Sequence, residues 1–307
     1  PLDFVLWKPS LGDDPGWDSP WGFGRPGWHI ECSAMSRKLL GDQIDIHGGG
    51  VDLLFPHHEN EIAQSECNGS CSFANFWVHN NLINFDNQKM SKSLGNIIKG
   101  RDFINDYNSE IFKFLILSVH YRSILNFNKK IIDQTIGNLI KIYSSLHLAS
   151  NIMSSNLEIK VNDDYKKEFE IYNEKIDAFL NNDLNTPGVF GILFDVIRKF
   201  NLLSVNKKIT SEIKFFADNF LKLFDKIGSL MGLFNESKSD FIMELNLLLL
   251  KSKSIKLSDI ENKIELRNKA RTTKDYILSD KIRDELLDVG IDLKDNPDGS
   301  TNWSVKI

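Results

Sequence analysis

The middle of the chain carries a hydrophobic pattern with the period of an α-helix. Apolar residues recur three and four positions apart in four segments, which predicts four amphipathic helices joined by short polar connections. The segments are residues 131–148, 164–180, 187–205 and 211–230. Asn185 or Thr186 is expected to cap the third helix, with Pro187 in its first turn. Helices connected in this way pack as an antiparallel bundle.

The first hundred residues follow a different pattern. Residues 1–28 are dense in Pro, Gly and Trp, which predicts loops and tight turns. The apolar spacing over residues 28–40 predicts a helix that ends at Gly41, and residues 43–47 alternate as a short strand does. A buried strand or hairpin is expected over residues 76–85. We therefore expect an α/β region ahead of the helices.

The last part of the chain is predicted to be a small helical domain. Polar segments at residues 235–240 and 252–258 interrupt the apolar pattern. A helix with many basic residues is expected over residues 260–273, and a second helix over residues 276–289. The end, DNPDGSTNWSVKI, is rich in turn-forming residues.

Composition narrows the class of protein. The chain has 307 residues, of which 41% are hydrophobic and 26% charged, and this is enough to bury more than one core. We find no signal peptide and no apolar run of the roughly 18–20 residues that a membrane-spanning helix needs. The 3 cysteines, Cys32, Cys67 and Cys71, are too few for a disulfide scaffold, so a reducing, cytoplasmic location is expected. A net charge of -5 gives no overall attraction to nucleic acid, so an RNA partner would need local basic patches.

Three residues have the chemistry and spacing of a zinc site. His57 and Glu61 are four positions apart in a helix that Pro56 is expected to begin, so their side chains share one face. Cys32 offers a third, soft ligand upstream, and a Cys, His and Glu set favours zinc over magnesium or calcium. Three protein ligands leave one coordination position open, which is typical of a catalytic zinc.

A lysine pair indicates contact with a polyphosphate. Lys89 and Lys92 lie in the pentapeptide KMSKS, which is followed by Leu94-Gly95-Asn96. Two ammonium groups on a loop of small, hydroxyl-bearing residues can neutralise the charge that develops on a leaving phosphate. We predict that both lysines bind ATP and act in catalysis.

A glycine triplet after the predicted strand is the second candidate for nucleotide contact. Glycines at a strand end allow backbone amides to approach a nucleotide closely. His79, in the next predicted strand, is either a structural histidine or a further nucleotide contact. The candidates for contact with the ATP ribose or adenine are His47, Gly48, Gly49, Gly50 and Asp52.

Four motifs in this order carry a family resemblance. They are GRPGWHIECSAM, HGGGVDLLFPHHENEIAQSE, KMSKSLGN and HYRSILNF. With them the chain resembles the class I cysteinyl-tRNA synthetases of bacterial type, and the similarity continues to the C-terminus. The resemblance implies a Rossmann-like catalytic domain that activates L-cysteine with ATP and Mg²⁺ and transfers it to tRNA(Cys). It also implies one zinc ion held by Cys32, His57 and Glu61, with Lys92 as the ATP-binding lysine.

In this interpretation zinc selects the substrate thiolate, and other residues surround it. Trp28 is expected to close over the substrate, with His29 and His58 lining the pocket, although His58 could equally be a residue of the helix surface. The C-terminal region is implied to bind the anticodon. Candidate contacts there are Arg267, Arg271 and Trp303, the last by stacking on an unpaired base.

The chain also departs from the family pattern. The amino-terminal HIGH-type signature and a fourth zinc ligand, a Cys from the same segment, have no counterpart in the sequence. We therefore expect a carboxyl-terminal portion of the enzyme, inactive by itself and monomeric. Cys67 and Cys71 could in principle replace the lost ligand, with surface or core thiols as the alternative. The expected divisions are an incomplete Rossmann-like domain at 1–96, a connecting helical region at 97–127, a helical bundle at 128–240 and an anticodon-binding domain at 241–307.

Two alternatives belong to other functional classes. A cysteine ligase acting on an amino sugar would share the catalytic fold and zinc site, but the basic helix and Trp303 at residues 257–307 speak against it. An inactive zinc-binding and tRNA-binding fragment is the other alternative. Exchange of pyrophosphate into ATP that depends on cysteine would distinguish these possibilities.

Overall fold

The computed structural model of the protein describes residues 4–67, 71–86, 88–89, 98–205, 207–295 and 299–306. The chain divides into two compact units. The first comprises Pro1–Asn84 and Tyr121–Leu125, and the second comprises Phe85–His120 and Asn126–Ile307. Within the described residues, no helix has the length and apolar character needed to cross a membrane.

A hairpin opens the first unit. Strands β1 (Trp7–Pro9) and β2 (Gly24–Pro26) pair antiparallel, with Trp7 opposite Pro26. A side chain at Gly24 would lie 2.5 Å from the carbonyl oxygen of Lys8, so the close strand contact requires glycine there. The Pro- and Gly-rich segment, predicted as loops and turns, therefore contains a short hairpin as well.

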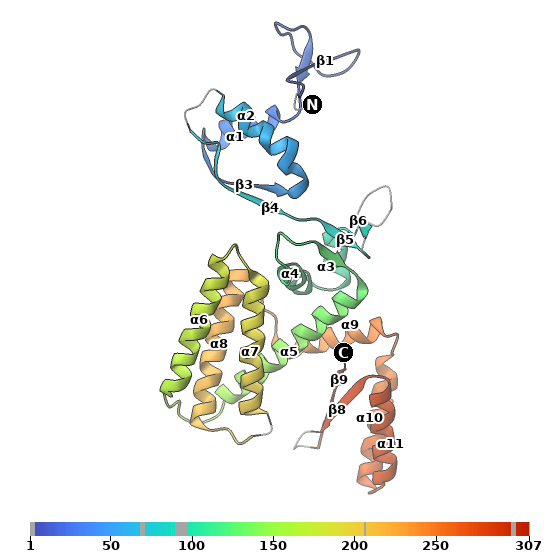
Figure 1. Ribbon diagram of the computed structural model, residues 1–307. Helices are drawn as coiled ribbons and strands as arrows, with labels where there is room; N and C mark the ends of the chain where they lie inside the picture. The colour runs from blue at the N-terminus through green and yellow to red at the C-terminus, as the bar shows by residue number, and fades with distance from the viewer. Residues whose placement is uncertain are drawn as a thin grey trace. The chain divides into compact units, whose positions relative to one another are not determined.

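The centre of the first unit is a parallel strand pair. Strand β3 (Ile44–Gly50) pairs with β4 (Ala74–Asn80), and the chain between them contains a 3₁₀ turn (Val51–Leu53), a π-helical turn (Leu54–His58) and helix α2 (Glu59–Glu66). Helix α1 (Ile30–Leu40) packs against α2 beside this pair (Figure 1). Ile44, Phe73 and Ala74 form its buried core. The predicted helix that ends at Gly41 and the strand near residue 43 are confirmed. The strand predicted near residue 76 is also present, but only Ala74 of β4 is buried and β4 does not form a hairpin with β5.

Three short strands form a separate small sheet in the order β6, β5, β7. Their bounds are β5 (Ile83–Phe85), β6 (Gln88–Lys89) and β7 (Leu125–Phe127).

The second unit contains the predicted helical bundle. Two helices of the unit precede the bundle, α3 (Gly100–Asp106) and α4 (Ser109–Leu117). The bundle region contains α5 (Lys129–Met153), α6 (Asp163–Asn181), α7 (Thr186–Ser204) and α8 (Ser211–Met231). Helices α6, α7 and α8 lie side by side (Figure 1), around buried phenylalanines such as Phe216 and Phe220. Asn185 caps α7 as predicted, because its side-chain oxygen accepts a hydrogen bond of 3.1 Å from the backbone N–H of Gly188.

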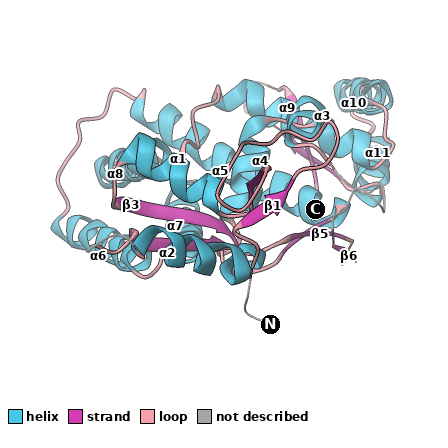
Figure 2. Ribbon diagram, turned by 90° about the horizontal axis from the view of Figure 1, so that it is seen from above, coloured by secondary structure: helices cyan, strands magenta, loops and turns pink. Residues whose placement is uncertain are grey.

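The C-terminal part of this unit is more than helical. Helix α9 (Lys238–Ser252), which the sequence pattern did not identify, is followed by α10 (Leu257–Thr272) and α11 (Tyr276–Asp288). Helices α10 and α11 lie side by side in Figures 1 and 2. The turn-rich end is an antiparallel hairpin of β8 (Ile291–Asp295) and β9 (Thr301–Val305). The turn-forming residues of this segment did not predict these strands, in which Ile291, Leu293 and Val305 are buried.

Candidate metal centre

Two neighbouring helices bring the predicted zinc ligands together. Cys32 lies in the first turn of α1, and Glu61 lies in the first turn of α2. Phe55 is extended, with φ -134° and ψ 132°, so the helical turn that carries His57 begins only at Pro56. The side chains of His57 and Glu61 meet one turn apart, with 2.6 Å between Nε2 and Oε1.

The three predicted ligands form one compact group. Their donor atoms, the sulfur of Cys32, a ring nitrogen of His57 and a carboxylate oxygen of Glu61, lie within 4.8 Å of one another. Glu61 is only 1% exposed. A buried carboxylate is costly unless it is paired or binds a metal ion. The placement of this group agrees with the spacing argument from the sequence.

The second carboxylate oxygen of Glu61 gives an independent test of whether a cation fits. Nε2 of His47 lies 2.8 Å from Oε2, but none of the described residues donates a well-aligned hydrogen bond to this buried oxygen. His47, His58 and Glu61 form a second group whose donor atoms also lie within 4.8 Å of one another. A buried acceptor without a donor, next to a thiol and imidazoles, fits a soft cation such as zinc.

The protonation of Cys32 is coupled to the same carboxylate. Burial raises the pKa of the Cys32 thiol, and the negative charge of Glu61 raises it further. Thiolate is the form that binds metal, so a cation between the two groups would offset this repulsion. The donor chemistry and the pairing of Cys32 with Glu61 therefore both fit zinc.

Histidines surround this group on two sides. His29 is 8% exposed, and its Nδ1 lies 2.7 Å from Nδ1 of His57. His58 is 3% exposed, and its Nδ1 lies 2.7 Å from Nε2 of His79. Burial, together with the neighbouring His47 and His79, lowers the pKa of His58 to about 4, so His58 is neutral near pH 7. The alternative that His58 is a surface residue is therefore wrong.

The glycine triplet has a packing explanation at one position. A side chain at Gly49 would lie 2.8 Å from Cε1 of His58, so glycine is needed there for the imidazole to approach β3. His47, expected near a nucleotide, is directed to Glu61. Gly48, Gly50 and Asp52 lie at the end of β3 and in the following turn, so their predicted ATP contacts remain a proposal.

Sequence reasoning missed that His47 and His79 join the same cluster. Both belong to the paired strands β3 and β4, and the ring of Trp77 packs against His47 with 4.7 Å between ring centroids. The only available signal was the alternation along each strand. His47 and Gly49 point to one face of β3, and their partners Trp77 and His79 point to the same face of β4.

The remaining candidate residues lie outside the metal-binding group or partly outside the described residues. Trp28 directly precedes His29 and is 77% exposed. Lys89 ends β6, but its side chain is outside the described part of the structure. Lys92 falls in residues 90–97, outside the described residues. Cys67 and Cys71 belong to neither metal-binding group found among the described residues.

The three anticodon candidates differ in exposure. Arg267 is 3% exposed and forms two hydrogen bonds with the carboxylate of Asp295, so it is a structural residue and we do not retain it as an RNA contact. Arg271 is also 2.8 Å from Asp295 but keeps 40% of its side chain exposed. Trp303 is half-buried in β9, opposite Leu293. Arg271 and Trp303 remain candidates.

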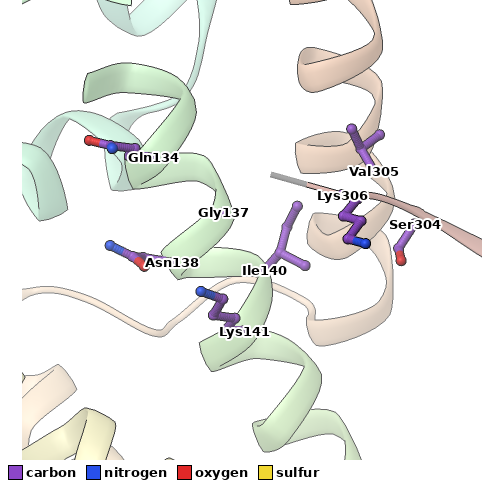
Figure 3. Close-up of a pocket in the computed structure, with 8 residues that line it drawn as sticks. All are labelled: Gln134, Gly137, Asn138, Ile140, Lys141, Ser304, Val305 and Lys306. Atoms are coloured by element: carbon purple, nitrogen blue, oxygen red, sulfur yellow. The ribbon is translucent and has the colours of Figure 1, made fainter. Parts of the chain in front are cut away.

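A cavity in the second unit offers different chemistry. Its volume is ≈ 630 Å³, and it lies between α5 and the end of β9 (Figure 3). The lining residues are Gln134, Gly137, Asn138, Ile140, Lys141, Ser304, Val305 and Lys306. This set contains no cysteine, histidine or carboxylate, so the cavity does not compete with the first unit as a metal centre.

Comparison with protein families identifies two segments. Residues 1–137 match the family described as the tRNA synthetases class I (C) catalytic domain. Residues 175–235 match the DALR domain. The first match contains the metal-binding group, and the second lies within the helical bundle.

Curated relatives resemble the chain over nearly its whole length. A cysteine–tRNA ligase of Bdellovibrio bacteriovorus is 43% identical over 99% of this chain and 63% of its own length. The ligases of Syntrophotalea carbinolica and Thermodesulfovibrio yellowstonii are 41% and 42% identical, each over 100% of this chain and 63% of their own length. The chain thus spans somewhat less than two thirds of these relatives.

Proposed function

Because the chain belongs to the cysteine–tRNA ligase family of class I tRNA synthetases, we propose that it acts in the ligation of L-cysteine to tRNA(Cys). The proposed reaction uses ATP with Mg²⁺ and passes through a cysteinyl-adenylate. A Rossmann-like catalytic domain is part of this proposal. Its support is that β3 and β4 pair in parallel and are connected in the chain by a segment that contains α2.

The observation that carries the proposal is the meeting of Cys32, His57 and Glu61. These side chains would hold one zinc ion, because a thiol and an imidazole converge on the buried carboxylate of Glu61, one oxygen of which has no hydrogen-bond donor among the described residues. When bound, zinc would supply a soft acceptor for the thiolate of the substrate, which the hydroxyl of serine cannot match. An apolar pocket alone separates substrates that differ by one small group by only about 10- to 200-fold.

Residues around the group would orient and enclose the amino acid. The exposed indole of Trp28 stands at the start of α1 and is proposed to cover the bound substrate. Neutral His58, held by His79, would offer a hydrogen-bonding nitrogen without adding positive charge. Lys89 and Lys92 are proposed to bind the phosphates of ATP and to stabilise the charge on the departing pyrophosphate.

The second unit is proposed to bind tRNA. Arg271 and Trp303 belong to the C-terminal helices and hairpin and could provide a charge and an aromatic face to unpaired bases. The net charge of -5 makes such local contacts necessary. A location in the cytoplasm and a monomeric state complete the proposal.

The substrate chemistry can be tested on the chain itself. Cobalt(II) would replace zinc, and L-cysteine or L-serine would be added while the sulfur-to-cobalt charge-transfer absorption is recorded. Growth of this absorption with cysteine bound to the protein, and none with serine, is expected. Cobalt(II) with cysteine but without protein is the control. An identical spectrum with and without cysteine would contradict the proposed thiolate site.

A further inference from the structure

We propose that His29 is a positioning residue that orients the imidazole of His57 for metal binding through a hydrogen bond between their Nδ1 atoms. This inference rests on the metal site proposed above. It assigns His29 a role distinct from lining the substrate pocket. The role would be exerted on a ligand rather than on the substrate.

The two imidazoles are in direct contact. Their Nδ1 atoms are 2.7 Å apart, and their ring centroids are 4.8 Å apart at an interplanar angle of 54°. The ring of Phe4 meets the ring of His29 edge-on, with 5.6 Å between centroids. Because His29 is 8% exposed, water has little access to this hydrogen bond.

The backbone of His29 gives a second, independent observation. Its φ is 78°, in the left-handed region that residues other than glycine and asparagine rarely adopt. It occupies the N-cap position of α1, yet its side chain forms no capping hydrogen bond. A capping residue such as Ser or Asp would suit this position better for helix stability alone. The side chain at this strained position is therefore used for another contact, and that contact is His57.

The chemistry of imidazole explains what the contact would do. Nε2 of His57 is the atom that faces Glu61, at 2.6 Å from Oε1. If Nε2 offers its lone pair to a metal ion, the ring proton must be on Nδ1, which then needs an acceptor. Nδ1 of His29 is that acceptor, with its own proton on Nε2. The hydrogen bond would thus fix both the tautomer and the ring orientation of His57.

His29 also connects the two elements that carry the ligands. It begins α1, and Cys32 follows three residues later in the same helix. Its side chain reaches the turn that leads into α2, where His57 and Glu61 are located. The side chain of His29 therefore positions His57, while its backbone begins the helix that carries Cys32.

Three substitutions separate the ring from the backbone. His29→Gly removes the acceptor and relieves the left-handed strain, and His29→Ala removes the acceptor but keeps a Cβ. His29→Asn retains an acceptor at the δ position. His79→Asn is the matched control, because His79 contacts His58 rather than a proposed ligand.

The affinity of the full 307-residue chain for Zn²⁺ would be measured by competition with a chromophoric chelator. His29→Gly and His29→Ala should bind zinc about 10- to 100-fold more weakly, whereas His29→Asn and His79→Asn should stay close to the wild-type chain. The ligand-field bands of bound cobalt(II) should shift in His29→Gly and return in His29→Asn. Circular dichroism would check that each variant is folded. Return of the cobalt(II) bands in His29→Asn alone could not result from a general folding defect.

The outcomes distinguish this inference from the zinc site itself. If the wild-type chain binds no zinc, or if Cys32→Ser leaves its zinc affinity unchanged, the proposed metal centre fails. If Cys32→Ser loses zinc while a folded His29→Gly binds it as tightly as the wild-type chain, only the role of His29 is overturned. Equal losses in His29→Asn and His29→Gly would likewise contradict a role through the δ acceptor.

Discussion

Arg267 and Asp295 are joined by two parallel hydrogen bonds, 2.8 Å from Nη1 to Oδ1 and 2.9 Å from Nη2 to Oδ2. The pair links α10 to β8, and Thr301 of β9 donates a further bond of 3.0 Å to the same carboxylate. A buried guanidinium with a bidentate partner stabilises the C-terminal elements and specifies their geometry. Asp295 therefore connects the hairpin of β8 and β9 to helix α10.

Removal of the Asp295 charge should destabilise the protein. In Asp295→Asn the buried guanidinium of Arg267 loses its counter-charge and one of its two hydrogen bonds, which should cost about 1–3 kcal/mol because the Asp295 side chain is itself 32% exposed. Urea unfolding followed by circular dichroism would measure the loss. Glu285→Gln is the control, because Glu285 pairs with Lys263, which lies in α10 as Arg267 does, but this pair is exposed; it should cost less than about 1 kcal/mol. Equal stability of the two variants would contradict a structural role for Arg267.

The same carboxylate predicts a dependence of stability on pH. Hydrogen bonds from Arg267 hold the pKa of Asp295 well below its ordinary value. A depressed pKa in the folded state stabilises the protein above the unfolded pKa of about 3.9, and this contribution is lost as the pH falls below it. Between pH 7 and about pH 3, the free energy of unfolding should therefore fall more in the wild-type chain than in Asp295→Asn. Parallel acid sensitivity in both would refute this assignment.

Metal content should follow the three predicted ligands. The purified chain is expected to hold about one zinc ion, and Cys32→Ser and Glu61→Gln should lose most of it. Elemental analysis after dialysis would measure this. Cys67→Ser is the matched control, since Cys67 is outside the metal-binding group, and it should retain zinc. Loss of zinc from Cys67→Ser would indicate instead that this thiol replaces the fourth ligand.

The lysine motif leads to a kinetic prediction. In the active ligase, Lys92→Ala should slow adenylate formation by about 10²- to 10³-fold, because its charge is proposed to act on the developing pyrophosphate. Its effect on the binding of cysteine should be small. Pre-steady-state measurement of adenylate formation and equilibrium binding of cysteine would separate the two effects, with Lys99→Ala as the control. Equal effects on both would argue against a transition-state role.

A buried polar network in the second unit predicts a stability difference. The carboxylate of Glu110, 2% exposed, accepts hydrogen bonds from the hydroxyl of Tyr143 and from the backbone N–H of Phe234. Tyr143→Phe would remove one of the two hydrogen bonds to Glu110 and the acceptor of the backbone N–H of Glu236, and should cost about 1–3 kcal/mol. Tyr172→Phe is a milder control, because the hydrogen bond of Tyr172 to Glu168 is only part-buried. A larger loss in Tyr172→Phe, measured by thermal unfolding, would contradict this difference.

Local pattern predicted much of the helical architecture. The period of apolar residues located α5 to α8, and Asn185 caps α7 as its sequence context indicated. These features depend on residues a few positions apart. The hairpin of β8 and β9 was missed because each strand is 5 residues long and gains its hydrogen bonds only from the other.

The sequence by itself determined that His57 and Glu61 share a helical face, because four residues make about one turn. It also supplied the thiol of Cys32 and the motifs that indicate a class I synthetase. Only the tertiary structure decided that Arg267 is buried against Asp295, that His47 reaches Glu61, and that His29 contacts His57. Each of these contacts joins residues 14 to 28 positions apart that belong to different elements. Their formation depends on how strands and helices pack, a relationship that the spacing of residues along one element does not contain.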